Sequence, residues 1–274
     1  MAASFDADGF LILEAFASLD SCADLMAQSR RIIDGFDAEQ NKVVFSAAGQ
    51  SHAATEYFIN SAGNISCFLE KGAVDENGNL IKDKHQAINK IGHALHDLDP
   101  VFAEFSRQPD LALVARGVGF HDPRLLQSMV ICKQPFIGGE VNPHQDSTFL
   151  YTEPQTCVGF WFALEDATIE NGCMWAAPGA HRSELRQRFA RGNDGMMEMT
   201  TLSDAPMENA DVPLDVPAGS LILLHGRLPH SSPENNSGRS RYAYALHLVD
   251  GTADYPASNW LQRADDFPTK GFVA

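Results

Sequence analysis

Two histidines and one aspartate have the spacing of a metal site. His144 and Asp146 lie two residues apart in the segment Gly-Gly-Glu-Val-Asn-Pro-His-Gln-Asp. In an extended segment such residues project to the same side, so an imidazole and a carboxylate can face one ion. His230 follows the apolar run Gly219–Leu224 and can supply a third ligand. Two histidines and a carboxylate form the facial triad of non-haem Fe(II) oxygenases, which leaves coordination positions open. The alternative is a polar loop in which Asp146 is only the hydrogen-bond partner of His144.

A second chemical signal lies in the run Arg241-Tyr-Ala-Tyr-Ala-Leu-His. Alternation along a strand places Arg241, Ala243, Ala245 and His247 on one face. An arginine beside two small side chains presents its guanidinium at the edge of a hollow, and this planar fork suits bidentate binding of a carboxylate. The alternative is a surface arginine with a salt-bridge partner. His247, like His225, is expected to be a core histidine whose hydrogen bonds are satisfied.

The elements that must position these side chains change in character along the chain. The first ~120 residues are mixed and mostly helical. They contain a short buried strand at Phe10–Leu13, a helix from a Ser18 cap to Gly35, and a helix over about Asp110–Arg116. After Pro123, short apolar runs alternate with turn residues, which predicts an antiparallel sandwich or barrel. These runs cover residues 125–132, 158–164, 173–176, 219–224 and 242–249. Helices packed outside such a core complete the expected fold.

One further helix is expected where Ile88, Ile91, Leu95 and Leu98 recur at helical spacing before Pro100. His93 and His96 would lie three residues apart on it and could bind a metal. No third ligand accompanies them, so we expect surface or structural roles.

Composition narrows the classes of partner. The chain has 274 residues, with 20 basic and 36 acidic side chains and a net charge of −16. This charge argues against nucleic acid and anionic membranes as partners and leaves a small molecule. The N-terminus is not a signal peptide and no run is long enough to cross a bilayer, so the cytoplasm is the default expectation. The five cysteines form no CxxC motif, which predicts buried reduced thiols. The oligomeric state is not predicted.

Several long motifs resemble the phytanoyl-CoA dioxygenase family. They are Gly138–Pro154, Glu165–Trp175 with Pro178–His181, and Gly219–Gly226 leading into Pro229-His230. The resemblance implies a double-stranded β-helix, a cupin-like jelly roll that is mainly β with flanking helices. It implies one domain over residues 1–274, with a helix-rich part over about 1–120, a jelly-roll core over about 121–250 and a C-terminal tail.

The same resemblance implies roles for individual residues. His144, Asp146 and His230 match the iron ligands, and Arg241 matches the arginine that pairs with the distal carboxylate of 2-oxoglutarate. Further contacts to this cosubstrate are matched by Ser232, Trp161 and Met129. The family also places a lysine upstream of the methionine. The possible occupants of that position here are Lys82, Lys84, Lys90 and Gln86.

The resemblance therefore implies an Fe(II)- and 2-oxoglutarate-dependent dioxygenase that hydroxylates a small organic substrate. Such an enzyme uses O2, decarboxylates 2-oxoglutarate to succinate and CO2, and is supported by ascorbate. Related halogenases have a small residue in place of Asp146, so this aspartate favours hydroxylation. Two alternatives stay open: a jelly-roll sensor that binds 2-oxoglutarate with little catalysis, and a metal-cupin lyase or isomerase. Arg241 argues against the second, because those enzymes need no anchor for 2-oxoglutarate. The substrate itself is not implied.

Overall fold

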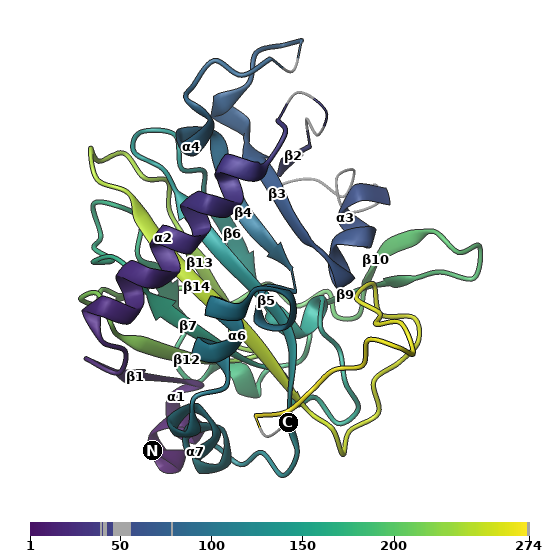
Figure 1. Cartoon of the computed structure of the whole chain (residues 1–274). Coiled ribbons are helices and arrows are strands. Elements are labelled where there is room, and N and C mark those ends of the chain that lie inside the picture. Colours follow the sequence, from purple (N-terminus) through teal and green to yellow (C-terminus); the bar gives the residue numbers. More distant parts are fainter. Residues whose placement is uncertain (39, 41–42, 46–55, 78, 273–274) are drawn as a thin grey trace.

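The framework of the molecule is a large β-sheet facing a smaller one, with helices outside (Figure 1). The computed structural model describes residues 1–38, 40, 43–45, 56–77 and 79–272. Within that part of the chain, the large sheet has eight strands in the order β1-β12-β7-β14-β5-β4-β3-β2. The small sheet has four in the order β11-β8-β13-β6, and β9 and β10 form a separate hairpin. The expected jelly roll with external helices is confirmed.

The helices and strands have the following bounds. The α-helices are α1 (Ala2–Asp8), α2 (Leu19–Gly35), α3 (Glu56–Asn60), α4 (Lys84–Ala87), α5 (Leu95–Leu98), α6 (Pro100–Ser106) and α7 (Pro109–Gly117). The strands of the large sheet are β1 (Phe10–Leu13), β2 (Val44–Phe45), β3 (Ile65–Glu70), β4 (Ile88–His93), β5 (Pro123–Lys133), β7 (Val158–Ala163), β12 (Leu221–His225) and β14 (Arg241–Asp250). The remaining strands are β6 (Val141–His144), β8 (Met174–Ala176), β9 (Gln187–Arg191), β10 (Met197–Thr201), β11 (Val212–Leu214) and β13 (His230–Ser232).

Strand β14 separates the two main cores. Its Tyr242, Tyr244, Leu246 and Leu248 lie in the core between the large sheet and the helices. Ala243 and Ala245 belong instead to the core between the two sheets. The alternation expected from the sequence is therefore confirmed. The small alanine side chains leave room on the inner face of the large sheet, where Arg241 and His247 also project.

Helix α2 covers the outer face of the large sheet (Figure 1). It begins where the Ser18 side chain accepts a hydrogen bond from the Ser21 amide, as expected of an N-cap. Cys22, Leu25 and Ile33 are buried on its sheet-facing side. These contacts pack the helix against the side of the sheet that faces away from the cavity.

The prediction of a helix over Ile88–Leu98 is wrong for the first half of that segment. Ile88–His93 form β4, which pairs with β3 and β5, and only Leu95–Leu98 are helical. β4 is buried on both faces, so its apolar residues show no two-residue alternation, and backbone pairing with two neighbours outweighs the helical spacing. His93 and His96 consequently do not share a helix face.

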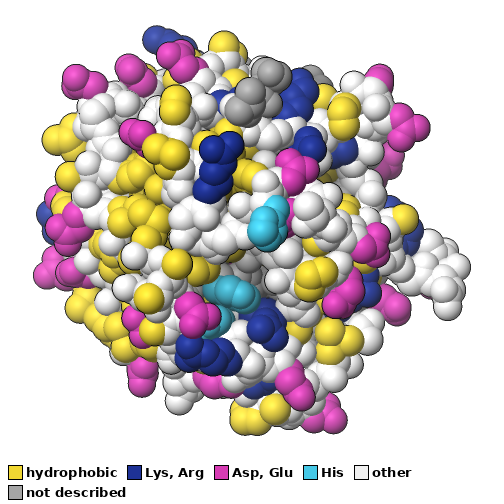
Figure 2. Space-filling model, turned by 90° about the horizontal axis from the view of Figure 1, so that it is seen from below, with side chains coloured by type: hydrophobic (Ala, Val, Ile, Leu, Met, Phe, Trp, Pro, Cys, Tyr) yellow, Lys and Arg dark blue, Asp and Glu magenta, His cyan; other side chains and the backbone are white. Residues whose placement is uncertain are grey.

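Two compositional expectations can be compared with the structure. All five cysteines are buried and free, so the expected burial is confirmed. In the described ranges, no helix combines the length and apolar character needed to cross a membrane. On the face shown in Figure 2, acidic side chains are spread around the periphery and form no single patch.

Candidate metal centre

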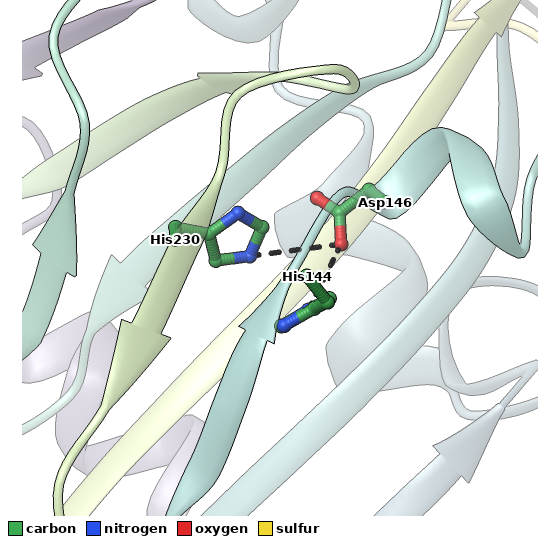
Figure 3. Close-up of side chains that lie close together, drawn as sticks. All are labelled: His144, Asp146 and His230. Carbon is green, nitrogen blue, oxygen red and sulfur yellow. Dashed lines mark ion pairs between the residues drawn. The ribbon is translucent and has the colours of Figure 1, made fainter. Parts of the chain in front are cut away.

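The small sheet and the turn after it bring His144, Asp146 and His230 together (Figure 3). His144 ends β6 and is paired directly with His230, which begins β13. Asp146 opens a short 3-10 helix, Asp146–Thr148. Its Oδ1 lies 3.6 Å from Nε2 of His144 and 3.7 Å from Nε2 of His230. One potential ligand atom from each residue lies within 4.8 Å of the others, which is the arrangement of three ligands on one ion.

The backbone fixes which nitrogen of each histidine faces the centre. Nδ1 of His144 lies 2.9 Å from the Asn142 carbonyl oxygen, and Nδ1 of His230 lies 2.9 Å from that of Leu228. A carbonyl can only accept, so each Nδ1 carries the proton and donates it. The Nε2 lone pairs are therefore left for a metal, and the carbonyls orient the rings as outer-sphere partners do in metal sites.

The charge states of the three side chains also suit metal binding. Burial opposes ionisation of Asp146, but the surrounding histidines outweigh it and hold its pKa well below the usual range. Burial, reinforced by His144, lowers the pKa of His230 to about 4. Burial also acts on His144, but hydrogen bonding and charge from Asp146 outweigh it and raise its pKa. The carboxylate is thus ionised and His230 neutral near pH 7, as metal binding requires.

The segment that carries two of the three residues is held on both sides. The Gln145 side chain donates to the Arg227 carbonyl at 2.8 Å and accepts from the Arg186 amide at 2.9 Å. The Ser147 amide donates to the Gly226 carbonyl at 2.8 Å. A Cβ on Gly226 would lie 2.4 Å from Oγ of Ser147 and 2.7 Å from the backbone carbonyl oxygen of Cys157, so only glycine fits this approach. The loop that leads to His230 is therefore locked onto the segment that carries His144 and Asp146.

The three residues line a cavity of about 470 Å³ between the sheets. Every residue that the sequence analysis named as a ligand or cosubstrate contact lies on its wall: His144, Asp146, His230, Met129, Trp161, Ser232 and Arg241. Met129 and Trp161 flank Ala245 in the large sheet, on the strands to either side of β14. The sheets thus bring a possible cosubstrate site and a possible metal site into one space.

Arg241 is the most unusual charge on this wall. It is 1% exposed, and its guanidinium carbon lies 5.3 Å from the centre of the Trp161 ring. Burial lowers its pKa to about 10, so the side chain remains protonated near pH 7. The salt bridges of the described residues include none to Arg241. The surface alternative is therefore wrong, and a buried cation without a bound carboxylate partner is what an anionic ligand needs.

Only one of the candidates for the upstream lysine position faces the cavity. Lys90 is buried on β4, and its Nζ lies 3.9 Å from Sδ of Met129. Lys84 instead donates to the backbone of Asp34 and Phe36. Lys82 and Gln86 are exposed. Sequence spacing left the position open because it depends on how β4 pairs with β5.

Sequence reasoning missed several residues around the cavity. His247 is buried, but its Nδ1 has no hydrogen-bond partner in the described structure, and its Nε2 lies 3.3 Å from Oδ2 of Asp146. The expectation of a satisfied core histidine is therefore wrong for this residue. Its place on the strand face of Arg241 was the available signal. An aromatic wall was also missed, formed by Phe58, Phe149, Phe189 and Trp260. Its members come from segments far apart in the sequence, and no spacing rule connects them.

The other candidate histidines have local partners. Nδ1 of His93 lies 2.7 Å from Oγ of Ser61, and Nδ1 of His96 lies 2.7 Å from Oγ of Ser128. Both are buried, so a structural role fits them and a surface role does not. A metal ion needs several histidine, cysteine or acidic side chains close together. Within the described ranges, one group of at least three such residues meets this condition: His144, Asp146 and His230.

Comparisons with known proteins find relatives that match nearly the whole chain. The profile of phytanoyl-CoA dioxygenase (PhyH) matches residues 5–243. The phytanoyl-CoA dioxygenase of Arabidopsis thaliana is 43% identical over 261 residues, which cover 95% of this chain and 92% of that protein. Phytanoyl-CoA dioxygenase domain-containing protein 1 of Mus musculus is 42% identical over 275 residues, which cover 96% and 94%.

Among solved structures, the fold is similar to that of the epimerase SnoN in complex with Fe3+, alpha ketoglutarate and nogalamycin RO. The TM-score is 0.65 at 18% identity, over 98% of this chain and 96% of that chain. At this identity the likeness shows the fold alone, a jelly roll. The profile and the two relatives cover nearly the whole chain, and this protein belongs to the phytanoyl-CoA dioxygenase family.

Proposed function

We propose that this protein is an Fe(II)- and 2-oxoglutarate-dependent dioxygenase that hydroxylates a small organic substrate and releases succinate and CO2. The observation that carries the proposal is the pairing of two features in one cavity. A histidine–aspartate–histidine group lies on the small sheet, and a buried arginine without a salt bridge lies on the large sheet. The first feature suits a metal, and the second suits the far carboxylate of a dicarboxylate ligand.

The residues fit iron by the chemistry of their donors. His144 and His230 would bind it through Nε2 and Asp146 through its carboxylate, a set that leaves three of six positions open. Iron supplies the activation of O2 when it is bound, and ascorbate serves as the reductant that keeps it ferrous. Nδ1 of each histidine is turned to a backbone carbonyl, so Nε2 of both histidines and Oδ1 of Asp146 face the space in which an ion would lie.

The protein's own contribution is to orient the cosubstrate. Arg241 grips the distal carboxylate with two parallel N–H donors, which fixes the direction of the molecule as well as its charge. Ser232 is buried on the adjoining wall and adds a hydroxyl donor. Lys90 adds a second positive charge from β4. Trp161 packs against the guanidinium, which keeps the fork in place.

The remaining wall restricts the substrate. The volume of about 470 Å³ falls within the range of roughly 300–1,000 Å³ typical of small-molecule pockets, and the cosubstrate must share it. Phe149 lies beside His144, and Phe189 packs against Phe149. A compact substrate with an apolar face fits this aromatic side of the metal site.

A turnover assay tests the proposal. Purified protein is supplied with Fe(II), ascorbate, O2 and 2-oxoglutarate labelled at C1, with Asp146→Ala as the matched control. We expect labelled CO2 and succinate from the native protein and none from the variant. Binding of 2-oxoglutarate without succinate, under every substrate pool tried, would support the sensor instead. Mass gains of one oxygen in fractionated metabolite pools would then identify the substrate.

A further inference from the structure

His247 lies where the large sheet touches the candidate metal centre. It is 6% exposed and projects from β14 into the cavity. On the neighbouring strands its register partners are Gly159 of β7 and Gln127 of β5. Nothing in the proposed function so far requires a histidine at this place.

The two oxygens of Asp146 face different groups. Oδ1 is directed at the two candidate ligands His144 and His230, and both dashed lines in Figure 3 end on it. Oδ2 is turned toward His247, whose Nε2 lies 3.3 Å away. Oδ2 is buried and receives no hydrogen bond from the described residues, so this imidazole is the group placed to supply one.

A glycine makes this approach possible. A Cβ on Gly159 would lie 3.2 Å from Oδ2 of Asp146 and 3.4 Å from Nε2 of His247. The first distance is tighter than nine in ten real Cβ contacts, and the second is at the limit of ordinary van der Waals contact, so a side chain here would press on the carboxylate while touching the imidazole. The absence of a side chain at Gly159 therefore opens the space in which the carboxylate and the imidazole meet.

We propose that His247 is a positioning residue of the metal centre, which holds Oδ2 of Asp146 through an N–H at Nε2 so that only Oδ1 is offered to the metal. A carboxylate that is free to turn can bind through both oxygens and fill a second coordination position. With one oxygen held, the three protein ligands leave three positions open. Outer-sphere partners of this kind orient metal ligands and are typically worth about 10- to 100-fold in affinity or activity. The inference rests on the proposed function only in requiring that the triad binds a metal.

The test is a Co²⁺ titration of the full-length protein, because the visible absorption of Co²⁺ reports both binding and coordination number without turnover. We expect His247→Leu to weaken Co²⁺ binding by about 10- to 100-fold. The spectrum should change toward a different coordination number. His247→Gln keeps an N–H donor at similar reach and should restore most of the affinity and the native spectrum.

Two further variants make the test specific. Gly159→Ala disturbs the same contact from the facing strand and should weaken binding in the same direction, even if His247→Leu does not fold. His225→Leu is the matched control, since His225 ends β12 and lines a separate cavity with Arg227. It should bind Co²⁺ like the native protein.

Native affinity and spectrum in His247→Leu would overturn the inference, and so would a folded His247→Gln that binds as poorly as the leucine variant. A native protein that binds no Co²⁺ would overturn the metal centre and this inference together. Co²⁺ binding that depends on His247, in a protein that forms no succinate, would refute the proposed hydroxylase but support the positioning role.

Discussion

Replacing Arg241 should weaken 2-oxoglutarate binding and stabilise the ligand-free protein at the same time. The guanidinium is 1% exposed and forms no salt bridge with the described residues. A charge-assisted hydrogen bond is worth about 1.5–3 kcal/mol, and each 1.4 kcal/mol is about tenfold in affinity. Arg241→Lys keeps the charge but loses the fork, so we expect roughly 10- to 100-fold weaker binding. Arg241→Ala should lose at least as much.

The stability effect has the opposite sign. The pKa of Arg241 falls from 12.5 to about 10 because of burial. That difference corresponds to about 3 kcal/mol of unfavourable free energy for the protonated form near pH 7. Replacing an uncompensated buried charge by an apolar side chain of similar size removes this cost. Arg241→Met should therefore unfold at a higher temperature than the native protein when no ligand is present.

Thermal unfolding with and without 2-oxoglutarate checks both effects, in anaerobic protein loaded with Mn²⁺ so that no turnover occurs. Ligand at 100 times its dissociation constant should stabilise the native protein by about 2.7 kcal/mol. For a chain of this size that is a rise in Tm of roughly 5–10 °C. Arg241→Met should start higher and show a much smaller rise, because a 100-fold weaker site gains only about 0.4 kcal/mol from the same ligand concentration. A native ligand response in Arg241→Ala, or a lower starting Tm in Arg241→Met with normal 2-oxoglutarate affinity, would refute the assignment.

Three further outcomes are expected. Asp146→Ala removes the anionic ligand, so hydroxylation should be lost and Mn²⁺ affinity should fall in calorimetry; hydroxylation at the native rate would show that Asp146 is not a ligand. Ser232→Ala removes one hydroxyl donor to the carboxylate and leaves the guanidinium fork in place, so the dissociation constant of 2-oxoglutarate should rise by about tenfold, less than in Arg241→Ala. Burial lowers the pKa of Lys90 to about 7, so the side chain is increasingly neutral above pH 7. Its attraction for a carboxylate is then lost, and 2-oxoglutarate affinity should fall by up to about tenfold per pH unit. In Lys90→Met that pH dependence should flatten, and an unchanged slope would remove Lys90 from the site.

The residues of the candidate metal and cosubstrate sites could be predicted because their placement depends on local periodicity. Alternation along β14 places Arg241 and His247 on the inner face, whatever the rest of the chain does. The two-residue spacing of His144 and Asp146 works in the same way at the end of β6. The third candidate ligand, His230, needs a pairing between distant strands. Its place after an apolar run suggested the role, and the resemblance to a family supported it.

The part of the cavity wall formed by β4 and the aromatic side chains could not be predicted. It is built by pairing between strands, and the apolar residues of β4 show no regular two-residue alternation. β4 is buried on both faces, and its apolar residues also fit a helix. Lys90 reaches the cavity only because β4 lies beside β5, with Lys90 opposite Ile131. The ring centres of Trp260 and Phe58 lie 4.6 Å apart, although the two residues are about two hundred positions apart in the sequence. Such contacts depend on the complete tertiary structure, so no short stretch of sequence contains a pattern that predicts them.

The net charge is the property least informative about the ligand. A chain with a charge of −16 repels large polyanions, yet its cavity holds the cation Arg241 and, near pH 7, the partly protonated Lys90. Charges on the outer surface are screened beyond a Debye length of about 8 Å at physiological ionic strength. A pair of opposite charges 4 Å apart near a protein is worth about 4 kcal/mol at an effective dielectric constant of about 20. A small dianion that enters the cavity therefore experiences the buried cations much more strongly than the acidic exterior. The surface charge and the cavity charge select for different partners: the first disfavours nucleic acid, and the second favours a small carboxylate.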